Sequence, residues 1–279
     1  MAYDEYSCLS VRIDSGAAFV TIDHAPINLL DMELIVELDR VGTELEADDE
    51  VRAVVLQSAN ADFFIAHADV ELIKQLPDDD TERPTELSVF HAMVDRFRTM
   101  PKATIGKIEG IARGGGSELL LSLDMRFAAT GKAVLAQPEV ALGILPGGSG
   151  TQRLPRLVGR GRAMEIVLGC DDFDAELAER YGYVNRALPA DEIGPFVDAL
   201  ARRIGSYPAD AIRLAKQAAA GAEPDPRDGL LEEAWCFNQT LSTPEAKRRM
   251  KTFMDGGGQT VELESGAGFA DVLAEKLSR

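Results

Sequence analysis

The chain has 279 residues, of which 46% are apolar and 27% are charged, a composition typical of globular proteins. No stretch approaches the ~20 consecutive apolar residues of a membrane-spanning helix, so we expect no membrane partner. The formal net charge of −18 also argues against nucleic acid or an anionic membrane surface as a partner, because binding to phosphate groups depends on Lys and Arg.

The N-terminal residues and the cysteines together favour a cytoplasmic protein. Residues 1–10 carry two acidic side chains and lack the basic start and apolar run of a secretory signal. The three cysteines, at positions 8, 170 and 236, are odd in number and widely spaced, which argues against a disulfide framework or a zinc cluster. We therefore predict a cytoplasmic location and no metal site.

The first half of the chain alternates between strand and helix patterns. Residues 9–13 and 18–22 alternate apolar and polar side chains, which predicts two strands around a turn at 14–16. Asp31 is a typical N-cap for a helix with one apolar face, formed by Leu34, Ile35, Leu38, Val41 and Leu45. Buried strands are predicted at 51–56 and 103–108, and the alternation up to about residue 150 favours an α/β fold.

The second half of the chain is predicted to be mainly helical. The predicted helices span residues 162–168, 174–181, 191–204, 209–219, 228–241 and 244–253, with one short strand near 183–186. The loop at 77–84 is rich in acid and proline, which indicates a mobile surface segment. The tail, 256–279, begins with three glycines and predicts a flexible linker with a short final helix. We predict a core domain at 1–195 and a helical C-terminal region at 196–279.

A glycine-rich segment at 110–118 is the first candidate for chemistry. Three consecutive glycines, Gly114 to Gly116, allow a ligand to approach the backbone closely. The apolar run that follows indicates a helix start, whose free N–H groups suit a developing oxyanion. Glu118 would lie one helical turn after Gly115. Taken alone, the segment fits equally well a tight strand–helix turn with Glu118 in solvent.

A second carboxylate, Glu139, follows Gln137-Pro138 and precedes an apolar stretch. In apolar surroundings its pKa would rise, and it could donate a proton near neutral pH. For an isolated glutamate, however, a solvated surface position is the more common interpretation.

The combination of segments resembles the crotonase (enoyl-CoA hydratase/isomerase) family. The resemblance rests on the segment 110–118, on Gln137-Pro138-Glu139 and on the run PGGSGTQRL at 146–154, and it covers about residues 9–190. It implies an α/β fold with a crotonase-type ββα spiral core and a helical C-terminal trimerisation region. It also implies an acyl-CoA thioester substrate, no cofactor apart from the CoA of that substrate, and a homotrimer or a dimer of trimers.

The resemblance assigns roles to four residues. The family's oxyanion hole consists of two backbone amides, which are matched here to Ala66 and Gly115. Glu118 would orient and deprotonate the attacking water, and Glu139 would deliver a proton to the α-carbon. Many relatives with other activities lack one or both glutamates, so the pair favours an enoyl-CoA hydratase that adds water across a trans-2-enoyl-CoA double bond.

Four further residues are expected to contact the substrate by the same resemblance: Gly114, His67, Ala68 and Asp69. The family usually has Gly where this chain has His67. The imidazole could crowd the thioester or acyl chain, contact CoA, act as a base, or point away into a neighbouring strand, and we favour a packing or surface position.

Contacts to CoA are not predicted from the tail, because the family's aromatic and Lys-rich end is reduced here to residues 251–254. Basic side chains would have to offset the acidic field near the CoA phosphates. The candidates from the sequence are Arg113, Arg153 and Arg156.

Other classes of protein fit the sequence less well. The glycines do not form the G-x-G-x-x-G of a dinucleotide site. The run at 147–151 lacks the last glycine of a hydrolase G-x-S-x-G motif, and the three histidines are isolated in sequence, which disfavours a metal hydrolase. Two alternatives stay open: another acyl-CoA reaction (isomerase, decarboxylase or C–C lyase), and a catalytically silent acyl-CoA binder.

Overall fold

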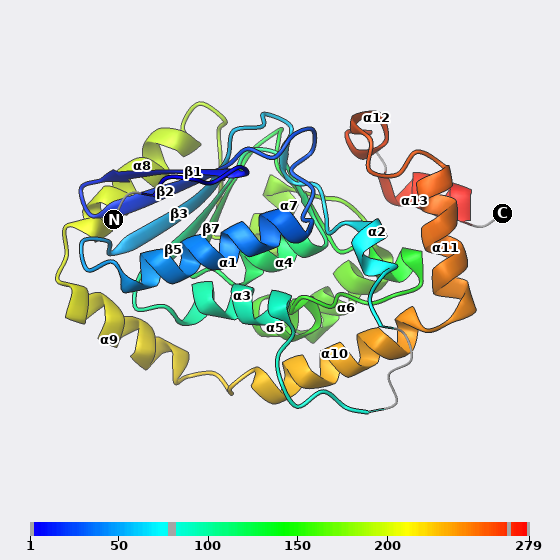
Figure 1. Ribbon diagram of the computed structural model, residues 1–279. Helices are drawn as coiled ribbons and strands as arrows, with labels where there is room; N and C mark the ends of the chain where they lie inside the picture. The colour runs from blue at the N-terminus through cyan, green and yellow to red at the C-terminus, as the bar shows by residue number, and fades with distance from the viewer. Residues whose placement is uncertain (1–2, 78–81, 267–268, 278–279) are drawn as a thin grey trace.

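Ten strands form two sheets in a computed structural model that describes residues 3–77, 82–266 and 269–277 (Figure 1). The strands of the larger sheet, in spatial order, are β1 (Leu9–Asp14), β2 (Ala17–Ile22), β3 (Ala53–Ser58), β5 (Ala103–Ile108), β7 (Met125–Ala129) and β10 (Arg186–Leu188). Those of the smaller sheet are β4 (Phe63–Ile65), β6 (Ile111–Arg113), β8 (Val134–Ala136) and β9 (Phe173–Asp174).

The order of the strands along the chain shows a spiral. Successive strand pairs, β3 with β4, β5 with β6, and β7 with β8, each place one strand in the larger sheet and the next in the smaller. Strands from successive turns pair in parallel within each sheet, whereas β1 pairs antiparallel with β2 and β9 antiparallel with β8. Helices connect the turns, as parallel strands require. This arrangement confirms the predicted α/β fold with a ββα spiral core.

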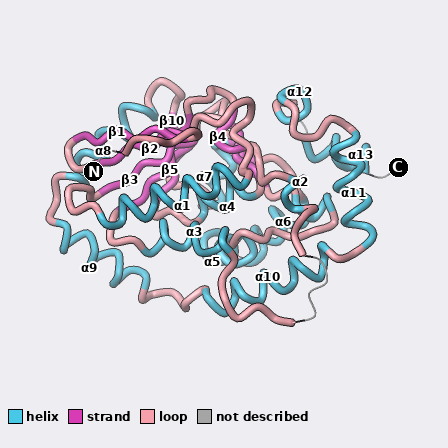
Figure 2. Tube along the Cα trace, in the orientation of Figure 1, coloured by secondary structure: helices cyan, strands magenta, loops and turns pink. Residues whose placement is uncertain are grey.

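The helices divide into a group within the spiral and a C-terminal group. The first comprises α1 (Met32–Ala47), α2 (Val70–Ile73), α3 (Val89–Thr99), α4 (Gly115–Leu121), the 3₁₀ helix η1 (Glu139–Leu142), α5 (Gly150–Val158), α6 (Arg160–Gly169) and α7 (Ala175–Tyr181). The second comprises α8 (Ile193–Gly205), α9 (Ala209–Ala220), α10 (Arg227–Leu241), α11 (Pro244–Asp255), α12 (Val261–Glu264) and α13 (Phe269–Leu277). In Figure 2 the helices α9 and α10 run beneath the core, and α11 to α13 lie on the side opposite the N-terminus.

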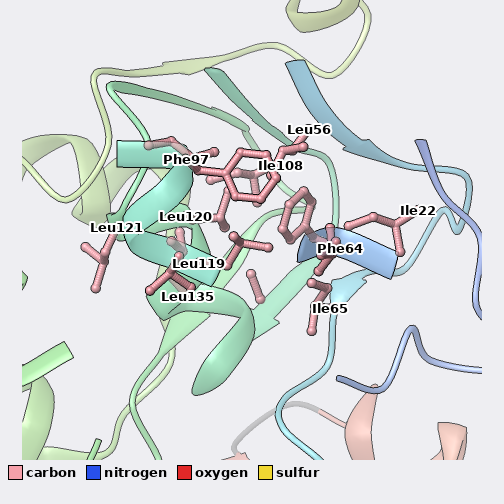
Figure 3. Close-up of a cluster of buried hydrophobic side chains, with 14 of the residues drawn as sticks. Ile22, Leu56, Phe64, Ile65, Phe97, Ile108, Leu119, Leu120, Leu121 and Leu135 are labelled. Carbon is pink, nitrogen blue, oxygen red and sulfur yellow. The ribbon is translucent and has the colours of Figure 1, made fainter. Parts of the chain in front are cut away.

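Apolar side chains cover the larger sheet on both faces. Leu56 and Ile108 pack with Phe64, Phe97 and the side chains of α4, and all of these are buried (Figure 3). On the opposite face, α8 packs on alternate residues of the same strands. A fully buried Leu or Phe side chain contributes about 1.5–3 kcal/mol, so α4 is held firmly where its first turn meets the end of β6.

Most predicted elements are confirmed, with small shifts at their ends. Asp31 caps α1 by accepting from the amide of Leu34 at 2.9 Å, and the five predicted apolar positions are buried. The strand expected at 51–56 begins at Ala53, and the one expected near 183–186 begins at Arg186. Part of the loop expected to be mobile, residues 78–81, lies outside the described residues.

The prediction of a flexible linker in the tail is wrong for its described residues. Leu273 and Leu277 of α13 are 1% exposed and pack with Phe253 and Met250 of α11. Glu264 of α12 has no exposed surface. The glycines at 256–258 therefore form a turn that lets the tail fold back on the core. The division of the chain at residue 195 stays a prediction.

No helix in the described part of the chain is both long and apolar enough to cross a membrane.

Candidate active site

A cavity of about 480 Å³ lies between the loop after β4, α2, α4, η1 and the C-terminal helices α10 and α11. Its walls are largely apolar, with Leu72, Ile73, Phe90, Phe237 and Phe253 among them. Both predicted carboxylates, Glu118 and Glu139, line it. Deep, mostly apolar cavities with a few convergent polar groups are typical of small-molecule sites.

Glu118 is fixed in place by the first turn of another helix. Its residue is 3% exposed, and its Oε1 accepts from the amides of Gly148 and Gly150, both at 2.8 Å. A Cβ at Gly148 would lie 2.6 Å from Oε2 and 2.0 Å from the ring of Phe90. The PGGSG run is therefore rich in glycine because its backbone lies against this carboxylate. One carboxylate oxygen is bound by the two amides, and Oε2 is left for a ligand.

Glu139 faces the same cavity from the start of η1. It is 9% exposed, and its buried Oε2 has no hydrogen-bond partner among the described residues. Its Oε1 would lie 2.7 Å from a Cβ at Gly114, where φ is +48°. Glycine is needed at 114 for both the backbone conformation and the approach of this carboxylate. An unpartnered buried carboxyl oxygen costs free energy, unless a ligand supplies the partner.

Burial is the main cause that raises the pKa of both carboxyl groups into the range of acid–base chemistry. Burial raises the pKa of Glu139 to about 8, with the charge of His67 opposing the rise and that of Glu233 adding to it. Burial, and then the negative charges of Glu139 and Glu233, raise the pKa of Glu118 well above its usual value. The amides of Gly150 and Gly148 act in the opposite direction. Near neutral pH the pair therefore retains a proton, and the amides favour the charged form of Glu118.

Two backbone amides point to where an oxyanion could bind. In the described part of the chain, neither the N–H of Ala68 nor that of Gly115 donates to a protein acceptor. Gly115 is the first residue of α4, so its amide lacks an intrahelical partner. The two positions are adjacent, since a Cβ at Gly115 would lie 3.6 Å from the Ala68 nitrogen. Both residues line the cavity.

The structure corrects the expectation that Ala66 supplies an oxyanion amide. The N–H of Ala66 donates to the carbonyl of Ile27 at 3.1 Å and so helps to join β4 to the preceding loop. An amide that already donates its hydrogen bond to a protein carbonyl cannot also bind a ligand. The free amide belongs to Ala68, two residues later, where the chain leaves the strand.

The other predicted substrate-binding residues divide between the cavity and its support. Gly114 and His67 line the cavity. Asp69 does not, because its carboxylate caps α2 by accepting from the amide of Glu71 at 2.9 Å. The His67 ring is buried but still lines the cavity, so it is not the surface residue that the sequence allowed. Its residue is 6% exposed and its Nε2 lies 3.1 Å from Glu264 Oε1.

The three arginines proposed to offset the acidic field do not line the cavity. Arg113 is buried and binds Asp172 through two hydrogen bonds, at 2.7 and 2.8 Å. Arg153 binds Ser149 and Asp95, and Arg156 is exposed on α5. Arg113 and Arg153 are thus used in contacts within the protein.

Another histidine, His24, is isolated in sequence but not in space. Its Nδ1 lies 3.2 Å from Cys8 Sγ and its Nε2 lies 2.8 Å from Asp31, the N-cap of α1. With Glu33, these groups could offer three ligand atoms to a cation. Burial and the charge of Glu37 are the leading causes that raise the pKa of the Cys8 thiol to about 12. A protonated Cys8 thiol bonded to His24, which in turn bonds to the N-cap of α1, fits a structural role in holding the start of that helix.

Sequence reasoning missed a third buried carboxylate, Glu233 of α10. Its Oε1 accepts from the amide of Ser149 at 2.6 Å and its Oε2 from that of Thr151 at 2.9 Å. These amides alternate with those of Gly148 and Gly150, which donate to Glu118. Four successive amides at the start of α5 are thus divided between two carboxylates, which the helix dipole also favours.

The sequence holds no signal that separates Glu233 from its exposed neighbour, Glu232. We expect Glu233→Ala to lower the free energy of unfolding by about 3 kcal/mol or more, because it leaves buried donors unpaired. Glu232→Ala removes an exposed pair with Arg83 and a contact with Cys236 Sγ, and it should leave the free energy of unfolding nearly unchanged. Urea denaturation measures both variants. Equal effects would show that Glu233 does not hold the start of α5.

Comparisons with known proteins agree with this geometry. A family model described as enoyl-CoA hydratase/isomerase matches residues 12–259. Short-chain-enoyl-CoA hydratase of Clostridium acetobutylicum is 35% identical over 245 residues, which are 87% of this chain and 92% of the relative. Crotonyl-CoA hydratase of Syntrophomonas wolfei is 34% identical over 231 residues, 82% of this chain and 87% of the relative. A crystal structure of a protein from Streptomyces avermitilis, provisionally assigned as an enoyl-CoA hydratase, has a TM-score of 0.90 at 39% identity and covers 98% of this chain and 99% of its own.

Proposed function

Because the chain belongs to the enoyl-CoA hydratase/isomerase family of the crotonase superfamily, we propose that its cavity adds water across the double bond of a trans-2-enoyl-CoA. The observation that carries the proposal is the pair of buried carboxyl groups, Glu118 and Glu139, in one cavity beside two unbonded amides. A protein that only binds acyl-CoA would not need two buried carboxyl groups with raised pKa values, which cost free energy of folding.

The proposed reaction assigns one step to each group. Glu118 accepts a proton from water as the water oxygen bonds to the β-carbon. The negative charge that builds on the thioester oxygen is stabilised by the amides of Ala68 and Gly115, which act where charge develops. Glu139 gives a proton to the α-carbon. Water is added overall, and one proton must pass from Glu118 back to Glu139 before the next cycle. CoA is part of the substrate, and the reaction needs no further cofactor.

The expected activity is the hydration of crotonyl-CoA or a longer 2-enoyl-CoA by the purified chain. It is measured as loss of absorbance of the conjugated thioester over a panel of chain lengths, with a saturated acyl-CoA as the blank. If no member of the panel reacts while CoA thioesters still bind, the chain is a binder. If a 3-enoyl-CoA is converted instead, it is an isomerase.

The oligomeric state and location stay predictions. A homotrimer or a dimer of trimers is supported by α9, none of whose 12 residues is buried in the single chain, and by Leu214 on that helix, which is 51% exposed. Contacts between subunits through this helical region would cover such a surface. A cytoplasmic location, and the absence of nucleic-acid and membrane partners, rest on the sequence alone.

A further inference from the structure

The C-terminal tail contacts both segments that carry the unbonded amides. Glu264 of α12 has no exposed surface. Its Oε1 lies 3.1 Å from Nε2 of His67, the residue just before Ala68. Its carbonyl oxygen accepts from Nη1 of Arg113 at 2.8 Å, two residues before Gly115. One tail residue therefore joins the loop after β4 to the end of β6.

A second tail residue strengthens this connection. Gln259 Oε1 accepts from the amide of Val70, the first residue of α2, at 2.6 Å. The amide of Gln259 in turn donates to Glu264 Oε1 at 3.1 Å. The ring of Phe253, at 5.9 Å from the His67 ring between centroids, packs edge-on against it. The loop around Ala68 is thus held from the tail at residues on both sides of it.

The two contacts of His67 require a proton on Nδ1 and another between Nε2 and Glu264. Its Nδ1 lies 2.8 Å from the carbonyl oxygen of Ala68, and a carbonyl can only accept, so Nδ1 must donate. Its Nε2 faces a carboxylate, so a proton must also lie between Nε2 and Glu264. If that proton is lost, a nitrogen lone pair faces a carboxylate oxygen in a buried space, and the contact becomes repulsive.

We propose that Glu264 is a positioning residue: through His67 and Arg113 it sets the position of the Ala68 amide relative to that of Gly115. Glu264 touches no reacting atom. Its carboxylate contacts His67, and its backbone carbonyl, which an alanine variant keeps, contacts Arg113. The proposal rests on the proposed function of the two amides. The His67–Glu264 contact joins residues 197 positions apart, and it accounts for the histidine at a position where the family usually has glycine.

Several charges face the His67 ring and decide how its proton responds to pH. They are Glu264 on α12, Glu139 on η1, and Arg113 on β6, which is itself paired with Asp172. Burial lowers the pKa of His67, but the charge and hydrogen bond of Glu264, with the hydrogen bond to the Ala68 carbonyl, raise it by more, so the net pKa is raised. The contact is therefore present below that raised pKa and is lost as the pH rises through it.

The test uses a conjugated cinnamoyl thioester of CoA, whose absorption moves to longer wavelength when amides polarise its carbonyl. The wild type should show this shift on binding. Glu264→Ala should lose most of it and lower kcat by about 10²-fold, with KM changed much less. Glu264→Gln can donate its amide N–H to a neutral His67, so it should keep the shift and extend it to higher pH than in the wild type.

A matched control lies on the same short helix. Glu262 is exposed, and Glu262→Ala should leave both the shift and kcat unchanged. A full shift and normal kcat in Glu264→Ala would overturn the proposal, as would a Gln variant as poor as the Ala variant. If the alanine variant fails to fold, the glutamine variant and its pH profile still decide. A wild type that neither hydrates nor shifts the bound thioester would instead overturn the proposed function.

Discussion

Glu139→Gln is expected to lower kcat for hydration by about 10²–10⁴-fold, the range typical of acid–base residues. Glutamine has the shape of the acid but no proton to give to the α-carbon. The side chain has no protein partner at Oε2 among the described residues, so the substitution should leave the fold and KM nearly unchanged. Stopped or continuous assays on the same enoyl-CoA give kcat and KM for both proteins.

The protonation of Glu139 also predicts how the rate of hydration by the wild type depends on pH. The pKa of Glu139 is raised to about 8, so the acid keeps its proton at neutral pH and loses it above that value. Hydration should therefore decline as the pH rises through about 8. A wild-type rate that is flat from pH 7 to 9.5, or a Gln variant with near-normal kcat, would contradict the assignment of Glu139 as the acid.

Glu118→Gln should lower kcat by a similar factor, about 10²–10⁴, for a different reason. The glutamine carbonyl can still accept from the amides of Gly148 and Gly150, so the start of α5 stays in place. The variant lacks the carboxylate that takes a proton from water. Circular dichroism and the KM for the enoyl-CoA should confirm an intact site.

Exchange of the α-proton in D₂O separates the roles of the two glutamates. A saturated acyl-CoA needs no water addition, and only the group near the α-carbon is required for exchange. Glu118→Gln should keep this exchange, and Glu139→Gln should abolish it. The reverse pattern would mean that the two roles are interchanged. Equal loss in both would mean that the pair acts as one unit.

Several features of the site could be predicted because they are local. The three glycines before Glu118 place a helix start and a carboxylate within one turn, and this spacing is set by helix geometry. Pro138 likewise acts locally, because its ring restricts the backbone just before Glu139. Both carboxylates line one cavity, and their roles as acid and base stay predictions for the assays above.

The error at Ala66 has a physical explanation. Sequence spacing shows that a strand ends near residues 65–69, but not which amide is the last to be used by the sheet. In the structure the amide of Ala66 donates to Ile27, a partner 39 positions earlier, so the first free amide falls at Ala68. The carboxylate of Asp69 is likewise used locally, as a helix cap.

The sequence by itself predicted an α/β fold, because that depends on local periodicity. Its resemblance to a family, carried by short segments, predicted the spiral core and the two carboxylates. Only the tertiary structure decided which amides are free, that Glu233 shares the start of α5 with Glu118, and that the tail reaches His67 through Glu264. The contacts of Glu233 with the start of α5 and of Glu264 with His67 join residues 82 to 197 positions apart. A buried glutamate and an exposed one, such as Glu264 and Glu262, are equivalent in sequence, and they differ only in what the folded chain brings to them.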